Sequence, residues 1–283
     1  MIENIVLSNP TELERLKNAI SKAGAGKFHV LADFDRTLTT AFVNGESIPS
    51  IISILRDENY LTPDYPQKAK DFYNKYHPIE IDPNISIEEK KKVMEEWWIT
   101  HFDLLIKSGL NKKDLEKVVD SGRIKLREGF SDFIDLLKKH NIPLVIMSSS
   151  GLGGDAISMY LEKEEKLYDN IFIISNSYNW DENGNAISVR QPIIHALNKY
   201  ETAVQDFPVF KVIKDKKSVL LLGDNLDDIG MIEGFEYDNL IKIGFLNENI
   251  EENLEHYKRN FDVVILNDSS MDYINNLLTE VIK

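Results

Sequence analysis

Short, nearly continuous apolar runs recur along the chain and are bounded by polar or small residues. They lie at 28–34, 142–148, 171–175, 218–223, 240–245 and 262–266. Runs of this length are typical of strands buried on both faces. Amphipathic stretches of ten or more residues separate several of them, so the alternation predicts an α/β fold whose parallel sheet is flanked by helices.

Apolar residues spaced by three and four positions predict the helices of this alternating part. We expect helices at 129–140, 152–165, 193–205 and 271–282, and a first helix that runs to about Ala23 with capping groups at 8–11. A short β-excursion over 178–190 contains a turn at 181–184.

A helical block follows the first buried strand and interrupts the alternation. The predicted helices of this block span 47–59, 63–76, 86–108 and 111–120, punctuated by Pro63, Pro78 and Pro83. An insertion at this point would lie over the carboxyl edge of the sheet, where such folds bind ligands. We therefore predict an α/β core over 1–44 and 123–283, and an inserted helical cap over 45–122 that controls access and substrate choice.

The first buried strand ends in Asp33-Phe-Asp35-Arg-Thr37. Successive side chains of a strand point to opposite faces, so the two aspartates can share one reacting centre only near the strand end. A carboxylate there can attack phosphorus and form an aspartyl-phosphate. The motif alone also fits a helix cap or a turn.

Hydroxyl and basic side chains form the second part of the predicted constellation. Ser148, Ser149 and Ser150 end a strand and precede glycines at a predicted helix start, which suits an anion but also an ordinary turn. Lys199, in the predicted helix 193–205, could neutralise a phosphate oxygen, although most lysines are solvated.

Acidic side chains form the third part. Asp224 follows the strand at 218–223, and Asp228 comes four residues later. Together with Asp33 they offer the oxygen ligands that Mg²⁺ prefers. A helix N-cap followed by acids near a helix dipole would give the same pattern.

Composition narrows the classes of function. The 283 residues include no cysteine, which excludes disulfides, thiolate catalysis and zinc–thiolate sites. We find neither a secretory pattern nor an apolar run of membrane-spanning length, and we expect a cytoplasmic protein. The net charge of −14 argues against nucleic-acid binding and would repel an anionic substrate, so Mg²⁺ and a lysine must reverse the sign locally.

The ordered set of Asp pair, serine loop, lysine and Gly-Asp-x-x-x-Asp resembles the haloacid dehalogenase (HAD) superfamily of phosphotransferases. Within it, the sequence looks like the cytosolic 5′-nucleotidase III family of pyrimidine 5′-nucleotidases and 7-methylguanosine-phosphate nucleotidases. The segments that carry this likeness lie at 75–83, 94–98, 126–130, 195–199 and 241–247. The likeness covers nearly the whole chain from about residue 28, including the helical block.

The resemblance implies a HAD-type, Rossmann-like core with a cap of the C1 type. It also implies a Mg²⁺-dependent 5′-nucleotidase that converts pyrimidine or 7-methylguanosine monophosphates to nucleoside and phosphate. On the matching positions, Asp33 is the nucleophile, Asp35 the general acid and base, and Thr37 supports the loop and the phosphate.

The remaining roles also come from the resemblance. Phosphoryl oxygens would contact Lys199 and Ser149, with Ser148 and Ser150 beside it. Mg²⁺ would contact Asp33, Asp224, Asp228 and the Asp35 carbonyl. The base would contact Glu80 and either Trp97 or Trp98. The choices between Ser148 and Ser149 and between Asp227 and Asp228 stay open, and His77 receives no chemical role.

Three other functions remain open at this point. The protein could hydrolyse another phosphomonoester, such as phosphoserine or a sugar phosphate, transfer phosphate to a nucleoside, or be a catalytically silent nucleotide-binding protein. The intact set of Asp33, Asp35, Lys199 and Asp224 argues against the silent protein. We expect a nucleotide as the partner, neither nucleic acid nor membrane, and a monomer, with oligomers left open.

Overall fold

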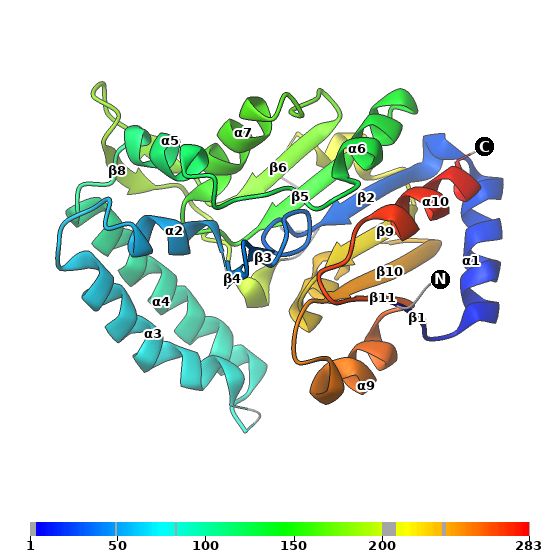
Figure 1. Ribbon diagram of the computed structural model, residues 1–283, viewed down its shortest axis with the longest axis horizontal. Helices are drawn as coiled ribbons and strands as arrows, with labels where there is room; N and C mark the ends of the chain where they lie inside the picture. The colour runs from blue at the N-terminus through cyan, green and yellow to red at the C-terminus, as the bar shows by residue number, and fades with distance from the viewer. Residues whose placement is uncertain (1–3, 49, 83, 200–207, 234–235, 283) are drawn as a thin grey trace.

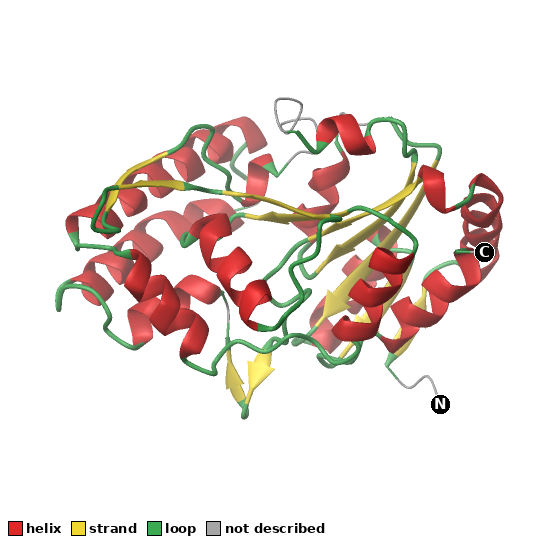
Figure 2. Ribbon diagram, turned by 90° about the horizontal axis from the view of Figure 1, so that it is seen from above, coloured by secondary structure: helices red, strands yellow, loops and turns green. Residues whose placement is uncertain are grey.

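The computed structural model describes residues 4–48, 50–82, 84–199, 208–233 and 236–282. In these ranges a seven-stranded sheet has the order β1-β11-β10-β9-β2-β5-β6 and lies between layers of helices (Figures 1 and 2). Neighbouring strands are parallel except for the edge pair β1–β11. The strands are β1 (Ile5–Leu7), β2 (Phe28–Ala32), β5 (Leu144–Ser148), β6 (Ile171–Ser175), β9 (Ser218–Gly223), β10 (Asn239–Leu246) and β11 (Val263–Leu266).

Both faces of the sheet are apolar, which is why its central strands appear as continuous hydrophobic runs. In β2, Val30 and Ala32 pack on one face and Leu31 on the other. The first face is covered by α1 (Pro10–Ala23), α6 (Phe130–Lys139), α7 (Gly153–Lys163) and α10 (Asp272–Val281). The second is covered by α8 (Phe210–Ile213), α9 (Ile250–Asn260) and the 3-10 turn η4 (Leu226–Ile232).

The strand order reverses at β2. From β2 the chain proceeds to β5 and β6 on one side of it, and then crosses to β9, β10 and β11 on the other. The carboxyl ends of β2, β5 and β9 therefore meet at one place, a topological switch point of the kind at which α/β sheets bind ligands. The predicted α/β class with a parallel sheet is confirmed.

A helical insert separates β2 from α6 and β5, as predicted (Figure 1). It comprises α2 (Ile51–Asp57), α3 (Tyr65–Ile81), α4 (Ile87–Lys107) and α5 (Lys112–Asp120). A small hairpin of β3 (Phe42–Val43) and β4 (Glu46–Ser47) precedes it, so the helix predicted over 47–59 was too long. The antiparallel pair α3–α4 extends away from the sheet.

A second hairpin, predicted over 178–190, attaches the insert to the core. It consists of β7 (Tyr178–Trp180) and β8 (Ala186–Val189). The Tyr178 ring meets the Phe102 ring of α4 edge-on, with ring centroids 5.8 Å apart. The N–H of Lys112 donates to the carbonyl of Gly184 at 2.9 Å. The insert is thus fastened to the core at a second place, far from its hinge, which is the hairpin of β3 and β4 through which the chain leaves the core.

Two helix predictions were wrong at an end. Residues 5–7 form β1 instead of a helix, because they pair with β11, and the Asn9 side chain caps the Glu12 N–H at 3.1 Å. Helix α3 does not stop at Tyr76 but continues through Pro78 to Ile81. Its packing along α4 outweighs the backbone hydrogen bond that Pro78 cannot donate.

The helix predicted over 193–205 was also wrong, as far as it lies in the described part of the chain. Residues 196–198 form a single 3-10 turn, η2, and 200–207 lie outside the described residues. The His195 Nδ1 accepts the N–H of Leu197 at 3.2 Å, and the Asn198 side chain accepts the N–H of His195 at 2.7 Å. These side chains compete with helical backbone bonds.

Two helices were not predicted at all. Helix α8 is short, and α9 carries the apolar residues Ile250, Leu254 and Tyr257 within a strongly charged segment. These three side chains are enough to seat α9 on the sheet, but they are too few to stand out in the sequence.

The capping role of His195 predicts how stability depends on pH. Burial lowers the pKa of His195 to about 4, so the folded protein holds the neutral ring that accepts the Leu197 N–H. The unfolded chain binds a proton at a higher pH, and stability therefore falls as the pH drops from about 6.5 toward 4. His195→Asn keeps a capping oxygen but cannot titrate. We expect its free energy of unfolding to fall by about 2 kcal/mol less than that of the parent between about pH 7 and pH 5.

Urea unfolding of both proteins at the two pH values measures this difference. His256→Asn, at an exposed position, is the control and should follow the parent. Equal pH dependence in the parent and in His195→Asn would contradict the prediction.

Candidate active site

Three loops that carry predicted site residues follow three neighbouring strands. Asp33 follows β2, Ser149 follows β5 and Asp224 follows β9. The N–H of Asp33 donates to the carbonyl of Leu222 at 3.0 Å, which extends the pairing of β2 with β9 up to the site. The predicted convergence of these residues at the carboxyl edge of the sheet is therefore present.

Lys199 lies between two of these acids. Its buried Nζ contacts Asp33 Oδ1 and lies 3.1 Å from Asp228 Oδ1. Burial alone would lower the pKa of Lys199, but the charges of Asp228 and Asp33 outweigh it and raise the pKa. The side chain is therefore an ammonium ion that is held within the site.

The turn η4 fixes the second acid. Asp228 Oδ2 accepts the N–H groups of Asp224 and Asn225 at 3.1 and 3.0 Å. The Asn225 side chain caps the Asp227 N–H in return, at 3.2 Å. Both oxygens of Asp228 are thus engaged. The Asp227 side chain is exposed, and its carboxylate forms none of these contacts.

Asp33, Asp224 and Asp228 form a group that fits a hard cation. One oxygen from each lies within 4.8 Å of the others. Burial, followed by the charge of Asp228, raises the pKa of Asp224 to about 7. Burial also raises the pKa of Asp33, which Lys199 opposes and the two other acids reinforce. Lys199 and Arg36, whose Nε lies 3.6 Å from Asp224 Oδ2, are two cations beside these three carboxylates, and an oxygen-preferring cation would balance the remaining negative charge.

Asp35 lies outside this carboxylate group and points to the insert. Its Oδ1 accepts the N–H of Ile51, the first residue of α2, at 2.9 Å. Burial raises the pKa of Asp35 to about 6, which the Ile51 hydrogen bond and Lys199 oppose. An aspartate with this pKa can hold a proton near neutral pH and still release it. Its predicted use of the backbone carbonyl for Mg²⁺ stays a prediction.

Thr37 and Arg36 complete the loop after β2. The Thr37 hydroxyl lies 3.5 Å from Asp224 Oδ1, and the Arg36 Nε lies 3.6 Å from Asp224 Oδ2. Arg36 has a left-handed backbone with φ 61°. A buried arginine, Arg127, donates to the carbonyls of this loop and was missed as a site residue, although its segment was part of the family likeness.

The three serine hydroxyls in the loop after β5 differ in their hydrogen bonds. Ser148 Oγ accepts the N–H of Ser150 at 3.1 Å, and Ser150 Oγ accepts the N–H of Leu152 at 3.3 Å. Both side chains are buried. The Ser149 hydroxyl is partly exposed and forms no hydrogen bond to the residues that the structure describes. It is the hydroxyl left available for a ligand.

The two tryptophans of α4 have different surroundings. Trp97 stacks on Tyr76 of α3, with ring centroids 5.6 Å apart and an angle of 15°. Trp98 faces the serine loop, because a Cβ placed on Gly151 would lie 2.9 Å from its ring and 2.4 Å from Ile52. Trp97 thus packs within the insert, and Trp98 lies where the insert meets the core.

Glu80 lies near the end of α3. Its carboxylate lies 3.0 Å from Nδ1 of His77, one turn earlier. After burial and the charge of Asp228, the charge of Glu80 is a further cause that raises the pKa of Asp227 in η4. His77, which received no role from the sequence, is thus the hydrogen-bonding neighbour of Glu80.

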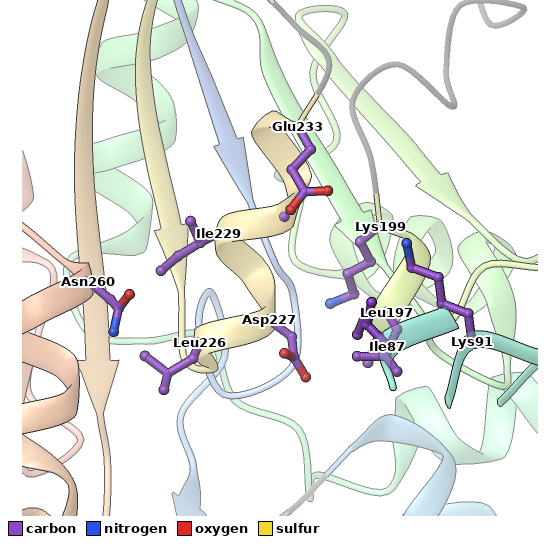
Figure 3. Close-up of a pocket in the computed structure, with 11 residues that line it drawn as sticks. Ile87, Lys91, Leu197, Lys199, Leu226, Asp227, Ile229, Glu233 and Asn260 are labelled. Carbon is purple, nitrogen blue, oxygen red and sulfur yellow. The ribbon is translucent and has the colours of Figure 1, made fainter. Parts of the chain in front are cut away.

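A cavity of about 340 Å³ opens beside Lys199 (Figure 3). Ile87 and Lys91 of α4 form its insert side, and Leu226, Asp227 and Ile229 of η4 form its core side. The Lys199 side chain points toward η4 in this view. The space therefore runs between insert and core and reaches the ion pair.

In the described ranges, no helix combines the length and the apolar character that crossing a bilayer requires.

The sequence matches the family described as pyrimidine 5′-nucleotidase (UMPH-1) over residues 36–282. A 7-methylguanosine phosphate-specific 5′-nucleotidase from Gallus gallus is 32% identical over 277 residues, which cover 98% of this chain and 95% of that protein. The Homo sapiens protein of the same description is 32% identical over 283 residues, covering 100% and 94%.

Solved structures agree with the sequence matches. Cytosolic 5′-nucleotidase IIIB bound to cytidine superimposes with a TM-score of 0.88 at 26% identity, covering 99% of this chain and 94% of that one. A phospho-aspartyl intermediate analogue of phosphoserine phosphatase shares the fold, with a TM-score of 0.53 at 19% identity over 90% of this chain and 98% of that one. With buried acids at the strand ends and these relatives across its length, the chain belongs to the pyrimidine 5′-nucleotidase (UMPH-1) family of the HAD superfamily and is a 5′-nucleotidase, a phosphoric monoester hydrolase.

Proposed function

We propose that this 5′-nucleotidase hydrolyses pyrimidine or 7-methylguanosine 5′-monophosphates by way of an aspartyl-phosphate on Asp33. The observation that carries this mechanism is the contact of Asp33 with Lys199 at the strand end, with Asp35 two residues further along the same loop. A nucleophile, a cation and a proton donor are then available at one centre, which is what phosphoryl transfer requires.

Asp33 attacks phosphorus, its new O–P bond forms, and the bond from phosphorus to the 5′ oxygen breaks. Lys199 favours the ionised form of Asp33 and can neutralise a phosphoryl oxygen, because its Nζ already contacts the attacking carboxylate. The hydroxyl of Ser149, which has no described partner, can donate to a second phosphoryl oxygen. Thr37 would hold the loop through its contact with Asp224.

Asp35 supplies and removes the proton. With a pKa of about 6, it can protonate the departing 5′ oxygen, which leaves as the nucleoside hydroxyl. The resulting carboxylate then takes a proton from the water that attacks the aspartyl-phosphate, and phosphate is released. The N–H of Ile51 stabilises the ionised form between these two steps.

Mg²⁺ fits the acidic group of Asp33, Asp224 and Asp228. The excess of carboxylate over ammonium charge, and the all-oxygen donor set, support this choice of cation. When bound, Mg²⁺ would screen the negative charge between Asp33 and the phosphate. Asp228, whose Oδ1 lies beside Lys199, would in addition orient that lysine.

The insert is proposed as the part that selects the base, with residues 45–122 as the cap and 1–44 and 123–283 as the catalytic core. Glu80 would accept hydrogen bonds from the base, and Trp98 would stack on it. Relatives are named as specific for 7-methylguanosine phosphate, and the 7-methylguanine ring carries a positive charge. A carboxylate and an indole face suit such a ring.

The setting of the enzyme is proposed as the cytoplasm, since related enzymes are named cytosolic. Its substrate is a small molecule that one chain can enclose between insert and core, so we propose a monomer.

The covalent route predicts the effect of Asp33→Asn. An amide cannot attack phosphorus, so kcat for phosphate release should fall at least about a thousandfold. EDTA should abolish the activity of the parent, and added Mg²⁺ should restore it. The control is Asp215→Asn, at an exposed position, which should retain full activity. Asp33→Asn with parental activity would show that the covalent route is wrong.

The base pocket predicts a pattern of substrates and variants. Among CMP, UMP, AMP, GMP, 7-methyl-GMP, phosphoserine and glucose 6-phosphate, we expect Mg²⁺-dependent turnover of CMP, UMP or 7-methyl-GMP. Glu80→Gln should raise KM for 7-methyl-GMP about tenfold, and more than for CMP, because it removes the charge opposite the cationic ring. Trp98→Leu should raise KM for all good substrates.

Trp97→Leu is the matched control, since Trp97 packs on Tyr76 within the insert. It should lower the unfolding temperature without changing the order of substrates. Turnover of phosphoserine or glucose 6-phosphate alone would retain the mechanism but remove the case for a base pocket.

A further inference from the structure

We propose that Arg127 is a positioning residue that joins the catalytic loop at 34–39 to the hinge of the helical insert. Its side chain is fully buried, with 0% exposure, so it cannot touch a substrate. Instead, it forms directed hydrogen bonds to two segments that the nucleotidase reaction needs in a fixed relation. The proposal deepens the proposed function, because it rests on Asp33 and Asp35 acting in that loop.

The first segment is the catalytic loop. Arg127 Nε donates to the carbonyl of Thr37 at 2.8 Å, and Nη2 donates to the carbonyls of Arg36 at 2.5 Å and Thr39 at 3.2 Å. Three carbonyls from four consecutive residues therefore converge on one guanidinium. Convergence of this kind curls the loop and holds the left-handed backbone of Arg36.

The second segment is the hinge, where the chain leaves the core for the insert. Arg127 Nη1 lies 2.9 Å from Asp268 Oδ1. The same carboxylate accepts the N–H groups of Ala41 at 2.8 Å and Phe42 at 3.1 Å. Residues 41 and 42 begin the hairpin that precedes the insert, so Arg127 and Asp268 connect that departure to the loop.

Arg127 also lies on the segment by which the chain returns from the insert. Its N–H donates to the carbonyl of Leu38 at 2.9 Å, and the N–H of Thr40 donates to the carbonyl of Lys125 at 2.9 Å. The departing and returning segments are thus paired side by side. A movement of the insert at this hinge therefore reaches the carbonyls of Arg36, Thr37 and Thr39 through the Arg127 side chain, in addition to the direct hydrogen bond from the insert to Asp35.

The contacts require arginine rather than another cation. A guanidinium has five donors in a plane, whereas an ammonium has three and cannot span both segments. Phe245 lies against the group, 4.1 Å from the guanidinium carbon to the ring centroid. Burial lowers the pKa of Arg127 to about 10, so the group stays charged at neutral pH.

Arg127→Lys tests the proposal in the full-length enzyme with Mg²⁺. We expect kcat to fall about tenfold to a hundredfold and KM to stay within about threefold, since a small displacement of reacting groups affects the chemical step. We also expect faster hydrogen exchange of the amides at 34–42. Lys125→Gln is the matched control, because Lys125 lies on the same returning segment but is exposed.

A purely structural role would give a different result. It would lower the unfolding temperature of Arg127→Lys but leave kcat per folded molecule and the exchange at 34–42 at the values of the control. That result would overturn the proposal.

Asp268→Asn is a second variant in case Arg127→Lys does not fold. Asp268 has a φ of 51°, which asparagine tolerates. The variant removes the negative charge that pairs with Arg127, so the loop is held less firmly. This should lower kcat about threefold to tenfold and speed hydrogen exchange of the amides at 36–42. Parental kcat and exchange in Asp268→Asn would overturn the proposal. Hydrogen exchange does not depend on the reaction. Activity in Asp33→Asn would therefore refute the covalent route, but it would leave the exchange test of Arg127 unchanged.

Discussion

The ion pair between Lys199 and its two acids is the constraint on which the site depends. Removing charges from water costs several kcal/mol for each ion, and the cost is recovered only with complete hydrogen bonding and good geometry. The fold supplies both: β2 and β9 deliver Asp33 and Asp224 side by side, and η4 engages the remaining oxygen of Asp228. The negative charge that is left over makes the group of Asp33, Asp224 and Asp228 suitable for a cation.

The polar side chains of the site are held mainly by backbone groups. Asp228 accepts two amides of its own turn, Asp35 accepts the first amide of α2, and the Tyr257 hydroxyl donates to the carbonyl of Asp224 at 2.5 Å. Backbone groups move only when their whole element moves. The position of Asp35 is consequently tied to the insert, whereas Asp33 and Asp224 are tied to the sheet.

The sequence predicted the sheet, the insert and the acids at the strand ends, because each has a local signal. Continuous apolar runs mark β2, β5 and β9, and the acids follow two of them directly. The turn around Lys199 escaped prediction, since Ile194 and Leu197 have helical spacing while His195 and Asn198 close a tighter turn with their side chains. Local side-chain hydrogen bonds, in place of helical backbone bonds, decided the outcome there.

Longer-range partners could not be predicted from the residues alone. Nothing near Arg127 in the sequence shows that its guanidinium meets carbonyls about ninety residues earlier. The different surroundings of Trp97 and Trp98 likewise could not be predicted, because both positions are apolar in the sequence and only the structure shows which ring faces Gly151. Such contacts arise from the packing of the insert on the core.

The hairpin β7–β8 has a consequence for the movement of the insert. A part that is fastened both at a hinge and at a second contact through Phe102 and Lys112 is limited, as a rigid body, to rotation about the line that joins the two attachments. Any other movement of the insert must bend the α3–α4 pair or break the contact between Tyr178 and Phe102. Substitutions in the packing of Tyr178 on Phe102 would then change how readily the insert moves, while the groups at the strand ends stay the same.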